Sequence, residues 1–274
     1  MLKTRILTAA ILLPSFLAAL FYFQPIFWAA LLLILTVTGA REWCKLTQFS
    51  VRNTIVFMLL TALFGGELLF VLSEAIQIDP YTPILINIYL LSFVFWILGV
   101  PLVMKLTDPI KNPFLLMLIG WLVLLPICLA MYQLRSISPL LLLGIMATIW
   151  ISDTAAYFSG RAFGKHKLAV TLSPGKTWEG VVGALVVVLI YALIWNYMTV
   201  DESLTVFLVP LLLLLTVLGI IGDLFESLMK RHAGVKDSGN ILPGHGGILD
   251  RIDALTSTLP VAMLAVLVFY STEL

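Results

Sequence analysis

Residues 204–222 read LTVFLVPLLLLLTVLGIIG, and no charged side chain interrupts this run. A helix needs about 20 apolar residues to cross the hydrocarbon core of a bilayer. The whole chain has the same character, because 61% of its 274 residues are hydrophobic and only 11% are charged. Soluble domains carry about 25% charged residues. The run therefore predicts a membrane-spanning helix, and the composition predicts an all-α integral membrane protein.

Eight more apolar segments fit or nearly fit this length, which makes nine expected transmembrane helices. The nine segments are 6–23, 25–40, 54–72, 84–104, 113–132, 139–159, 178–199, 204–222 and 254–271. Another apolar segment follows the first almost at once, so we expect the first to be a retained span and not a cleaved signal peptide. No repeat or linker divides the chain. We therefore expect one polytopic domain, 1–274, with N-terminal spans in 1–135 and a more charged half in 136–274.

The basic residues test this count, because cytoplasmic loops of membrane proteins carry an excess of Lys and Arg. With the N-terminus in the cytoplasm and nine crossings, every one of the 16 Lys and Arg residues except Arg135 falls on the cytoplasmic side. The acidic residues Glu74, Asp79, Asp201 and Glu202 fall on the other side. The pattern predicts a cytoplasmic N-terminus and a C-terminus on the opposite side.

The most charged stretch begins at Gly222 and reads GDLFESLMKRHAGVKDSGNILPGHGGILDRID. On a helix, Asp223, Ser227 and Lys230 would share one face, because they stand at i, i+4 and i+7. Asp250 and Asp253 would also share a face if the last helix begins there. The glycines between these groups can turn their backbone N–H groups toward an anion.

These residue types suit phosphoryl or nucleotidyl transfer. A divalent cation between Asp223 and Asp250 would relieve the repulsion of the carboxylates, and Mg²⁺ commonly binds one or two carboxylates together with substrate phosphates. Nearby Lys and Arg would neutralise the remaining phosphate charge. The alternative is a solvated loop held by ordinary ion pairs.

The connection after the sixth span faces the same side and contains GRAFGKHK and SPGKTWEG. Ser173 and Thr177 can cap the helix that follows, with Glu179 in its first turn. A P-loop is excluded because its spacing and its preceding strand are absent. We interpret the connection as a phosphate or headgroup clamp, the alternative being a basic topology loop.

Four other polar residues have simpler interpretations. His245 stands between two glycines and could act as a general base, or make a structural hydrogen bond within the turn. Glu67 is an acid inside an apolar span, and we expect a protonated or paired carboxyl at a helix contact. Cys44 and Cys128 show neither metal spacing nor a disulfide pattern.

The motifs together resemble the phosphatidate cytidylyltransferase (CDP-diacylglycerol synthase) family. The resemblance rests on SLMKR at 227–231, KD at 236–237, LPGHGG at 242–247 and DRID at 250–253, with SDTAAYFSGRAFGKHKL and LSPGKTWEG upstream. It covers roughly 152–253, while the first five spans are similar only in hydropathy and length.

This resemblance implies a reaction of CTP with phosphatidic acid that gives CDP-diacylglycerol and pyrophosphate. It implies Mg²⁺ held by Asp223 and Asp250, with Asp253 as a further carboxylate, and leaves a second, monovalent cation open. The implied catalytic residues are Asp223, Ser227, Lys230, Arg231, Lys236, His245, Asp250 and Asp253. The implied substrate-binding residues are Asp153, Tyr157, Arg161, Lys165, Ser173, Lys176, Thr177, Glu179, Gly246, Gly247 and Arg251.

The expected partners are CTP, phosphatidic acid and membrane lipids, with no nucleic acid, and a homodimer is left open. The expected location is a bacterial plasma membrane, with the active site facing the cytoplasm. Two other functions stay open. One is a CDP-alcohol phosphotransferase, although its D-G-x-x-A-R pattern is absent; the other is a transporter of an anionic substrate, although the charges gather at one face instead of at mid-bilayer.

Overall fold

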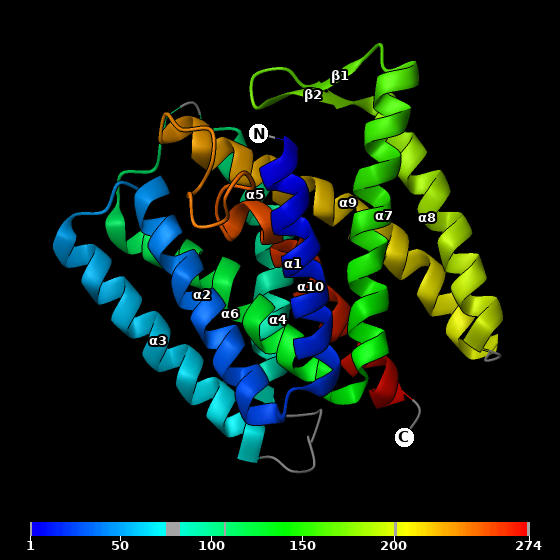
Figure 1. Ribbon diagram of the computed structural model, residues 1–274, viewed down its shortest axis with the longest axis horizontal. Helices are drawn as coiled ribbons and strands as arrows, with labels where there is room; N and C mark the ends of the chain where they lie inside the picture. The colour runs from blue at the N-terminus through cyan, green and yellow to red at the C-terminus, as the bar shows by residue number, and fades with distance from the viewer. Residues whose placement is uncertain (1, 75–82, 107, 200–201, 273–274) are drawn as a thin grey trace.

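The computed structural model describes residues 2–74, 83–106, 108–199 and 202–272, and most of them are helical (Figure 1). The helices are α1 (Leu2–Tyr22), α2 (Pro25–Leu46), α3 (Val51–Glu74), α4 (Pro83–Val94), the π-helical turn η1 (Phe95–Gly99), α5 (Val100–Met104), α6 (Pro113–Ile137), α7 (Pro139–Phe163), α8 (Trp178–Thr199), α9 (Glu202–His232) and α10 (Leu249–Thr272). Two short strands, β1 (Lys167–Ala169) and β2 (Ser173–Thr177), pair antiparallel between α7 and α8.

Within the described residues, eight helical stretches are long and apolar enough to cross a membrane, which confirms the all-α membrane fold. One of them is Pro83–Met104, in which α4, η1 and α5 follow one another without a break. The helix widens at η1 just before Pro101, whose nitrogen has no hydrogen to donate to the preceding turn. The apolar part of α1, Ile6–Tyr22, is shorter.

Polar side chains mark the ends of several helices. Asn112 caps α6 by accepting from the backbone N–H of Phe114 at 2.9 Å, and Pro113 provides the first helical residue. Arg135 lies at the other end of α6 and donates to the carbonyls of Leu20 and Phe23, at the end of α1. A cation is favourable at a helix C-terminus, so this position stabilises the charge of Arg135.

The helices surround α6 and α10, which form the centre of the bundle. In both, 61% of the apolar window is buried, whereas only 17% is buried in α8 at the periphery. Figure 1 shows α9 crossing the bundle from α8 toward α5. It also places the start of α1, the β1–β2 hairpin and the α9–α10 connection at one end, and the end of α10 at the other.

The helices α7 and α8 pack closely because small residues line their contact. A Cβ added to Gly183 would lie 2.0 Å from the Ser159 hydroxyl oxygen, so only glycine allows this approach. The contact holds the hairpin that joins α7 to α8 at a fixed place above the bundle.

The structure corrects the sequence interpretation at the charged connections. The helix α9 continues through the charged residues to His232 and does not end at Gly222, so the α9–α10 connection is only 233–248. Strands in 167–177 were not predicted, because three- and five-residue strands are too short to show an alternating pattern. Glu67 is exposed, and no described residue forms a hydrogen bond or an ion pair with it. Asp79 and Asp201 lie outside the described residues.

Candidate functional site

The C-terminal part of α9 carries Asp223, Glu226, Ser227 and Lys230 on one side, which we call the polar face of α9. The helix expected from their spacing is therefore present. The Ser227 hydroxyl donates to Asp223 across one helical turn at 3.4 Å. The C-terminal part of α9 lies at the end of the bundle that also contains the hairpin and the α9–α10 connection.

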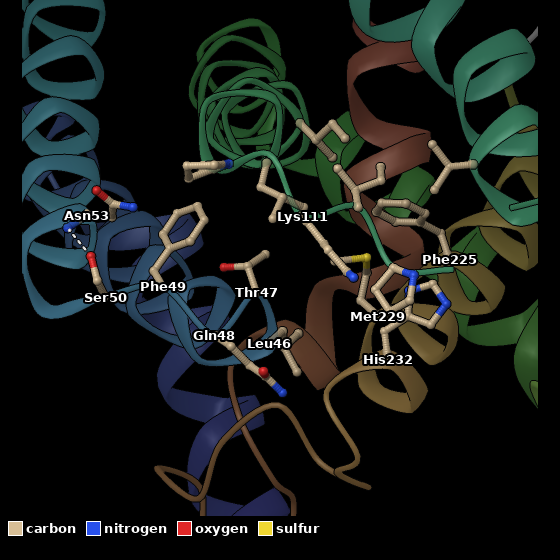
Figure 2. A pocket seen from close by; sticks show the side chains of 16 residues that line it. Leu46, Thr47, Gln48, Phe49, Ser50, Asn53, Lys111, Phe225, Met229 and His232 are labelled. Atoms are coloured by element: carbon tan, nitrogen blue, oxygen red, sulfur yellow. Dashed lines mark hydrogen bonds between the residues drawn. The ribbon is translucent and has the colours of Figure 1, made fainter. Parts of the chain in front are cut away.

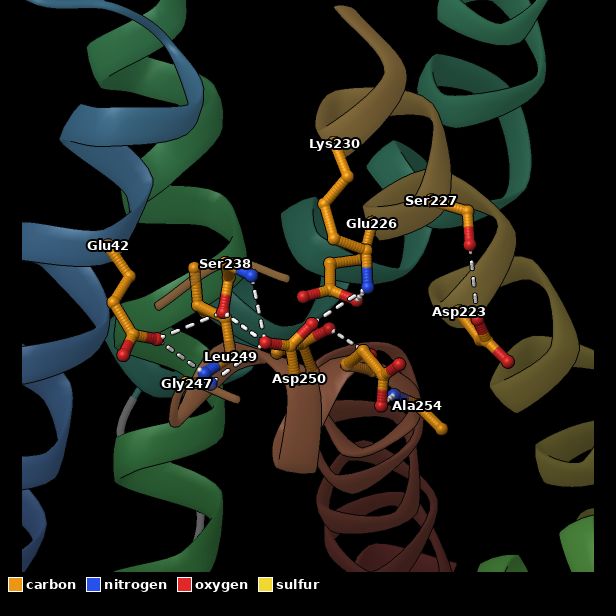
Figure 3. A network of polar contacts seen from close by, with 12 residues as sticks. Glu42, Asp223, Glu226, Ser227, Lys230, Ser238, Gly247, Leu249, Asp250 and Ala254 are labelled. Atoms are coloured by element: carbon orange, nitrogen blue, oxygen red, sulfur yellow. Dashed lines mark hydrogen bonds and ion pairs between the residues drawn. The ribbon is translucent and has the colours of Figure 1, made fainter. Parts of the chain in front are cut away.

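Lys230 joins this polar face to the first turn of α10. Its ammonium lies 2.6 Å from Glu226 Oε2 and 2.8 Å from Asp250 Oδ1 (Figure 3). The three side chains are 13%, 8% and 5% exposed, respectively. Because buried charges are stable only with partners, this arrangement fixes the distance between the two helices.

The other oxygen of Asp250 folds the α9–α10 connection. It accepts from the Ser238 N–H at 2.8 Å, the Ser238 hydroxyl at 2.9 Å and the Gly247 N–H at 2.8 Å. Gly246, at φ +83°, leaves room for this carboxylate, because an added Cβ would lie 2.5 Å from Asp250 Oδ2. Both oxygens of Asp250, expected to bind metal, are therefore engaged with protein donors.

A second buried carboxylate, that of Glu42 in α2, holds the same connection and was not identified from the sequence. It is fully buried and accepts from the N–H groups of Ile248 at 3.0 Å and Leu249 at 2.8 Å (Figure 3). The Ser238 hydroxyl donates to it at 3.2 Å. An added Cβ on Gly247 would lie 2.4 Å from Glu42 Oε2, so this glycine is needed for the contact.

The helices α9 and α10 approach closely at Gly222. An added Cβ there would lie 2.7 Å from the Asp253 carbonyl oxygen, so a larger residue would push the helices apart. The approach brings the Asp223 and Asp253 carboxylates within electrostatic range of each other, and Asp153 of α7 is near enough to both to repel them.

Of the described groups near Glu226, none donates to its buried Oε1. The carboxylates of α7, α9 and α10 in this region therefore outnumber the two ammonium groups paired with them, those of Lys176 and Lys230.

A cavity of about 510 Å³ opens beside Asp223, and we call it the polar cavity. The residues of α7, the hairpin and α9 that line it include Asp153, Tyr157, Arg161, Ser173, Lys176, Thr177 and Asp223. Lys176 reaches across from β2, and its ammonium lies 2.6 Å from Asp223 Oδ2. The two charged segments that the sequence suggested as parts of one site therefore meet here.

The hairpin is held in place by residues next to this cavity. Thr177 caps α8 by accepting from the Gly180 N–H at 3.1 Å. The Glu179 carboxylate accepts from the His166 N–H and lies 2.7 Å from its Nδ1, which ties α8 to the start of the hairpin. Glu179 therefore positions the clamp and does not line the cavity. Ser173 lies in β2 and does not cap the helix.

A second cavity, of about 450 Å³, lies between α1, α2, α6, α7 and α10, and we call it the apolar cavity. Leu, Ile, Met and Phe side chains make most of its wall, while His245 and Arg251 line it where the α9–α10 connection meets α10. The His245 Nδ1 is buried, and no described residue bonds to it. Glycine 246 and its neighbours thus serve the fold of the connection, and His245 faces this cavity.

The two cavities follow one another along α7. Met146 and Trp150 line the apolar cavity, and Asp153 and Tyr157 line the polar cavity. These four residues stand at i, i+4, i+7 and i+11, so they lie on one side of the helix. An amphiphile could therefore lie along α7 with its apolar part in one cavity and its charged part in the other.

Three basic residues expected at the site lie elsewhere. Lys165, Arg231 and Lys236 are exposed and line none of the cavities described here. The described residues also contain no group of three or more Asp, Glu, His or Cys side chains arranged to hold a metal ion. The expected trio of Asp223, Asp250 and Asp253 is therefore not gathered around one point.

Comparison with known proteins gives the family. Residues 3–269 match the profile of the "Cytidylyltransferase family". The chain belongs to this family. It is 36% identical to the phosphatidate cytidylyltransferase of Haemophilus influenzae, over 95% of this chain and 96% of that protein. It is 38% identical to that of Pseudomonas aeruginosa, over 95% of each chain. It is also 47% identical to the Staphylococcus haemolyticus protein of the same name, over 47% of this chain and 50% of that protein.

Membership in the cytidylyltransferase family makes this chain a membrane-bound nucleotidyltransferase. The transporter and the CDP-alcohol phosphotransferase considered above are set aside. The match extends through α1–α5, where the sequence motifs offered no comparison. These helices contribute Glu42 and one wall of the apolar cavity, so they form part of the site and not only a membrane anchor.

We expect Glu42→Gln to loosen the α9–α10 connection. A neutral amide with one carbonyl oxygen cannot accept all three hydrogen bonds, and an unsatisfied buried group costs about 1–3 kcal/mol. The thermal unfolding midpoint in detergent should fall, and turnover should fall with it. Glu67→Gln is the matched control, since Glu67 is an exposed acid in α3, and it should change neither. Equal behaviour of the two variants would contradict this role for Glu42.

Proposed function

We propose that this chain transfers the cytidylyl group of CTP to phosphatidic acid, giving CDP-diacylglycerol and pyrophosphate. The supporting observation is the arrangement of a polar and an apolar cavity along one side of α7, which suits one charged and one lipid substrate. The names of the relatives, which match over nearly their whole length, agree with this reaction.

In this proposal the nucleotide lies in the polar cavity. Its volume of about 510 Å³ falls in the usual range of small-molecule sites. Lys176 and Arg161 would contact the phosphates, with Lys176 exchanging its partner Asp223 for the triphosphate. Thr177 and Gly160 shape the wall where the hairpin meets α7.

Two of the three expected carboxylates suit a Mg²⁺ site better than all three together. Asp223 and Asp253 would hold it, because they lie near each other and their charges exceed those of the neighbouring cations. Mg²⁺ commonly takes one or two carboxylates and completes its shell with phosphates and water. Bound there, it would neutralise the charge that develops on the triphosphate. Asp250 would position α10 and the connection through its four donors.

The reaction joins an oxygen of the lipid phosphate to the α-phosphorus of CTP. The bond from that phosphorus to the oxygen bridging to the β-phosphorus breaks, and the electron pair leaves with pyrophosphate. No covalent intermediate with the protein is required. The residues contribute by holding both phosphates in line and by neutralising charge, which are the main contributions in phosphoryl-type transfers.

The acyl chains of phosphatidic acid would lie in the apolar cavity. Its walls from α1, α2, α6 and α7 offer a lining similar to the bilayer core. Arg251 and His245, at the end of this cavity near the α9–α10 connection, would contact the lipid phosphate.

We also propose that the site faces the cytoplasm of a bacterial plasma membrane. The relatives are bacterial, and the chain crosses the membrane several times. The hairpin, the α9–α10 connection and the start of α1 share one end of the bundle. Lys and Arg are frequent in and beside these segments, as they are in cytoplasmic loops. CTP is supplied from that compartment in this proposal.

Purified protein supplied with labelled CTP, phosphatidic acid and Mg²⁺ should form labelled lipid and release pyrophosphate in equal amounts. A chelator should abolish the reaction and added Mg²⁺ should restore it. Asp223→Asn should lower kcat by about 100-fold or more, because Mg²⁺ would lose one of its two carboxylates and the triphosphate would lose the charge that neutralises it. Asp108→Asn, an exposed acid outside both cavities, should behave as wild type. No lipid product from the wild type, or near-normal kcat in D223N, would refute the proposal.

Filling the apolar cavity should impair lipid binding selectively. Ala9 lines this cavity from α1, and Ala9→Trp adds a ring where the acyl chains are proposed to lie. The KM for long-chain phosphatidic acid should rise several-fold while the KM for CTP stays unchanged. The neighbouring Ala10 is exposed and does not line the cavity, so Ala10→Trp is the control. Equal KM values for the two variants would place the chains elsewhere.

A membrane-impermeant maleimide can test the orientation. Gly175, in the hairpin, has open space around it, and Tyr197, near the other end of α8, is 86% exposed. Gly175→Cys should be labelled in inside-out vesicles only, and Tyr197→Cys in intact spheroplasts only. Cys44 and Cys128 are buried and should contribute little background. The reverse pattern would place the site on the outer face.

A further inference from the structure

A third cavity, of about 410 Å³, lies behind α9 and is separate from both substrate cavities; we call it the back cavity (Figure 2). The turn between α2 and α3, the segment between α5 and α6, and the end of α9 enclose it. The segments that enclose it lie at the same end of the bundle as the hairpin. Nothing in the proposed reaction uses it.

The same turns of α9 that carry the polar face also form the wall of this cavity. Phe225, Met229 and His232 line it, and they stand at i, i+4 and i+7. At about 100° per residue they project from the side of α9 opposite to the polar face. A molecule in the back cavity would therefore touch the helix that positions the reaction without touching the substrates.

The two ionisable side chains among the described residues that line the back cavity are both basic. Lys111 and His232 come from separate segments, and Figure 2 shows their side chains projecting into the same space beside Met229. Neither forms a hydrogen bond or an ion pair with the described residues, and none of the described residues lining the cavity is Asp or Glu. Two basic groups that converge without a carboxylate favour an anion between them.

Thr47, Gln48, Ser50 and Asn53 add neutral polar groups to the wall, and the other lining residues are apolar. Leu116 and Ile119 of α6 belong to this apolar part, together with Phe225 and Met229. A free phosphate ion would leave this surface facing water, whereas an attached hydrocarbon chain would cover it. The site thus combines a basic edge with an apolar floor, as basic pockets for anionic headgroups between membrane helices do.

The backbone at the cavity edge is unusual as well. Gln48 has a φ of 53° and is the sole residue other than glycine with a positive φ in the described part of the chain. It directly follows Thr47, the C-cap of α2, a position that usually takes glycine. Strained backbone of this kind is often found where a ligand is clamped. Here it turns the chain so that Thr47 and Phe49 line the cavity on either side.

We propose that the back cavity binds an anionic phospholipid as an effector, distinct from the substrate lipid. Its phosphate lies between Lys111 and His232, and the start of its chains covers the floor formed by Phe225 and Met229. The bound lipid braces α9 from behind, on the side opposite to the polar face. This site stands apart from the proposed reaction, and its occupancy can be measured without turnover.

The test measures the unfolding midpoint of the purified protein with a short-chain phosphatidylglycerol, which is not a substrate of the proposed reaction. At about ten times its dissociation constant, this lipid should raise the midpoint by roughly 3–6 °C. The matching phosphatidylcholine and glycerol 3-phosphate should each give a much smaller shift, since one lacks net charge and the other lacks chains.

Lys111→Ala should lose the phosphatidylglycerol shift and keep its turnover of CTP and phosphatidic acid. Lys105→Ala, which removes the same charge outside the cavity, should keep the shift. Retention of the shift in K111A would overturn the proposal. An equal shift with phosphatidylcholine, or with glycerol 3-phosphate, would overturn it too, by showing that charge or chains play no part. Failure of the CTP assay would leave these shifts unaffected, so the two proposals can fail separately.

Discussion

The buried ammonium of Lys230 holds the polar ends of α9 and α10 together, and the site depends on it. Its partners Glu226 and Asp250 belong to different helices, so the ammonium sets both the distance and the rotation between them. Removing one member of a buried ion pair costs about 3–5 kcal/mol, because the remaining charges lose their compensation. Two carboxylates would then face each other, and α10 would have to move. Asp253 and the α9–α10 connection would move with it.

The continuation of α9 past its apolar run makes this interaction available. At 31 residues, α9 is longer than the roughly 20 that cross a bilayer, and the extra turns carry the polar face. Gly222 stands at the junction and does not end the helix. Its missing side chain lets α10 approach instead, since an added Cβ would lie 2.7 Å from the Asp253 carbonyl oxygen. A residue that often ends helices serves here to join two of them.

The predictable parts were those encoded by local spacing. Apolar run lengths predicted the helices, and i, i+4, i+7 spacing predicted the common face of Asp223, Ser227 and Lys230. Contacts between distant segments could not be predicted in this way. Glu42 lies 207 positions from Leu249, and nothing near Glu42 distinguishes it from an acid at the end of a span. The donors that occupy Asp250 come from Ser238 and Gly247, whose positions depend on the folded connection.

The aromatic packing on one side of α9 determines where the charged groups on its other side lie. Phe225 packs against Trp43 of α2 and Trp96 of η1, with ring centroids 6.2 and 5.6 Å away, so α9 can neither rotate nor slide without disturbing this aromatic cluster. The neighbouring Glu226 projects toward Lys230 from the same turn. The position of the charged groups is therefore set by apolar packing on the opposite side of the helix. For the same reason, a molecule bound beside Phe225 and Met229 would act on the polar face through α9, without touching the substrates.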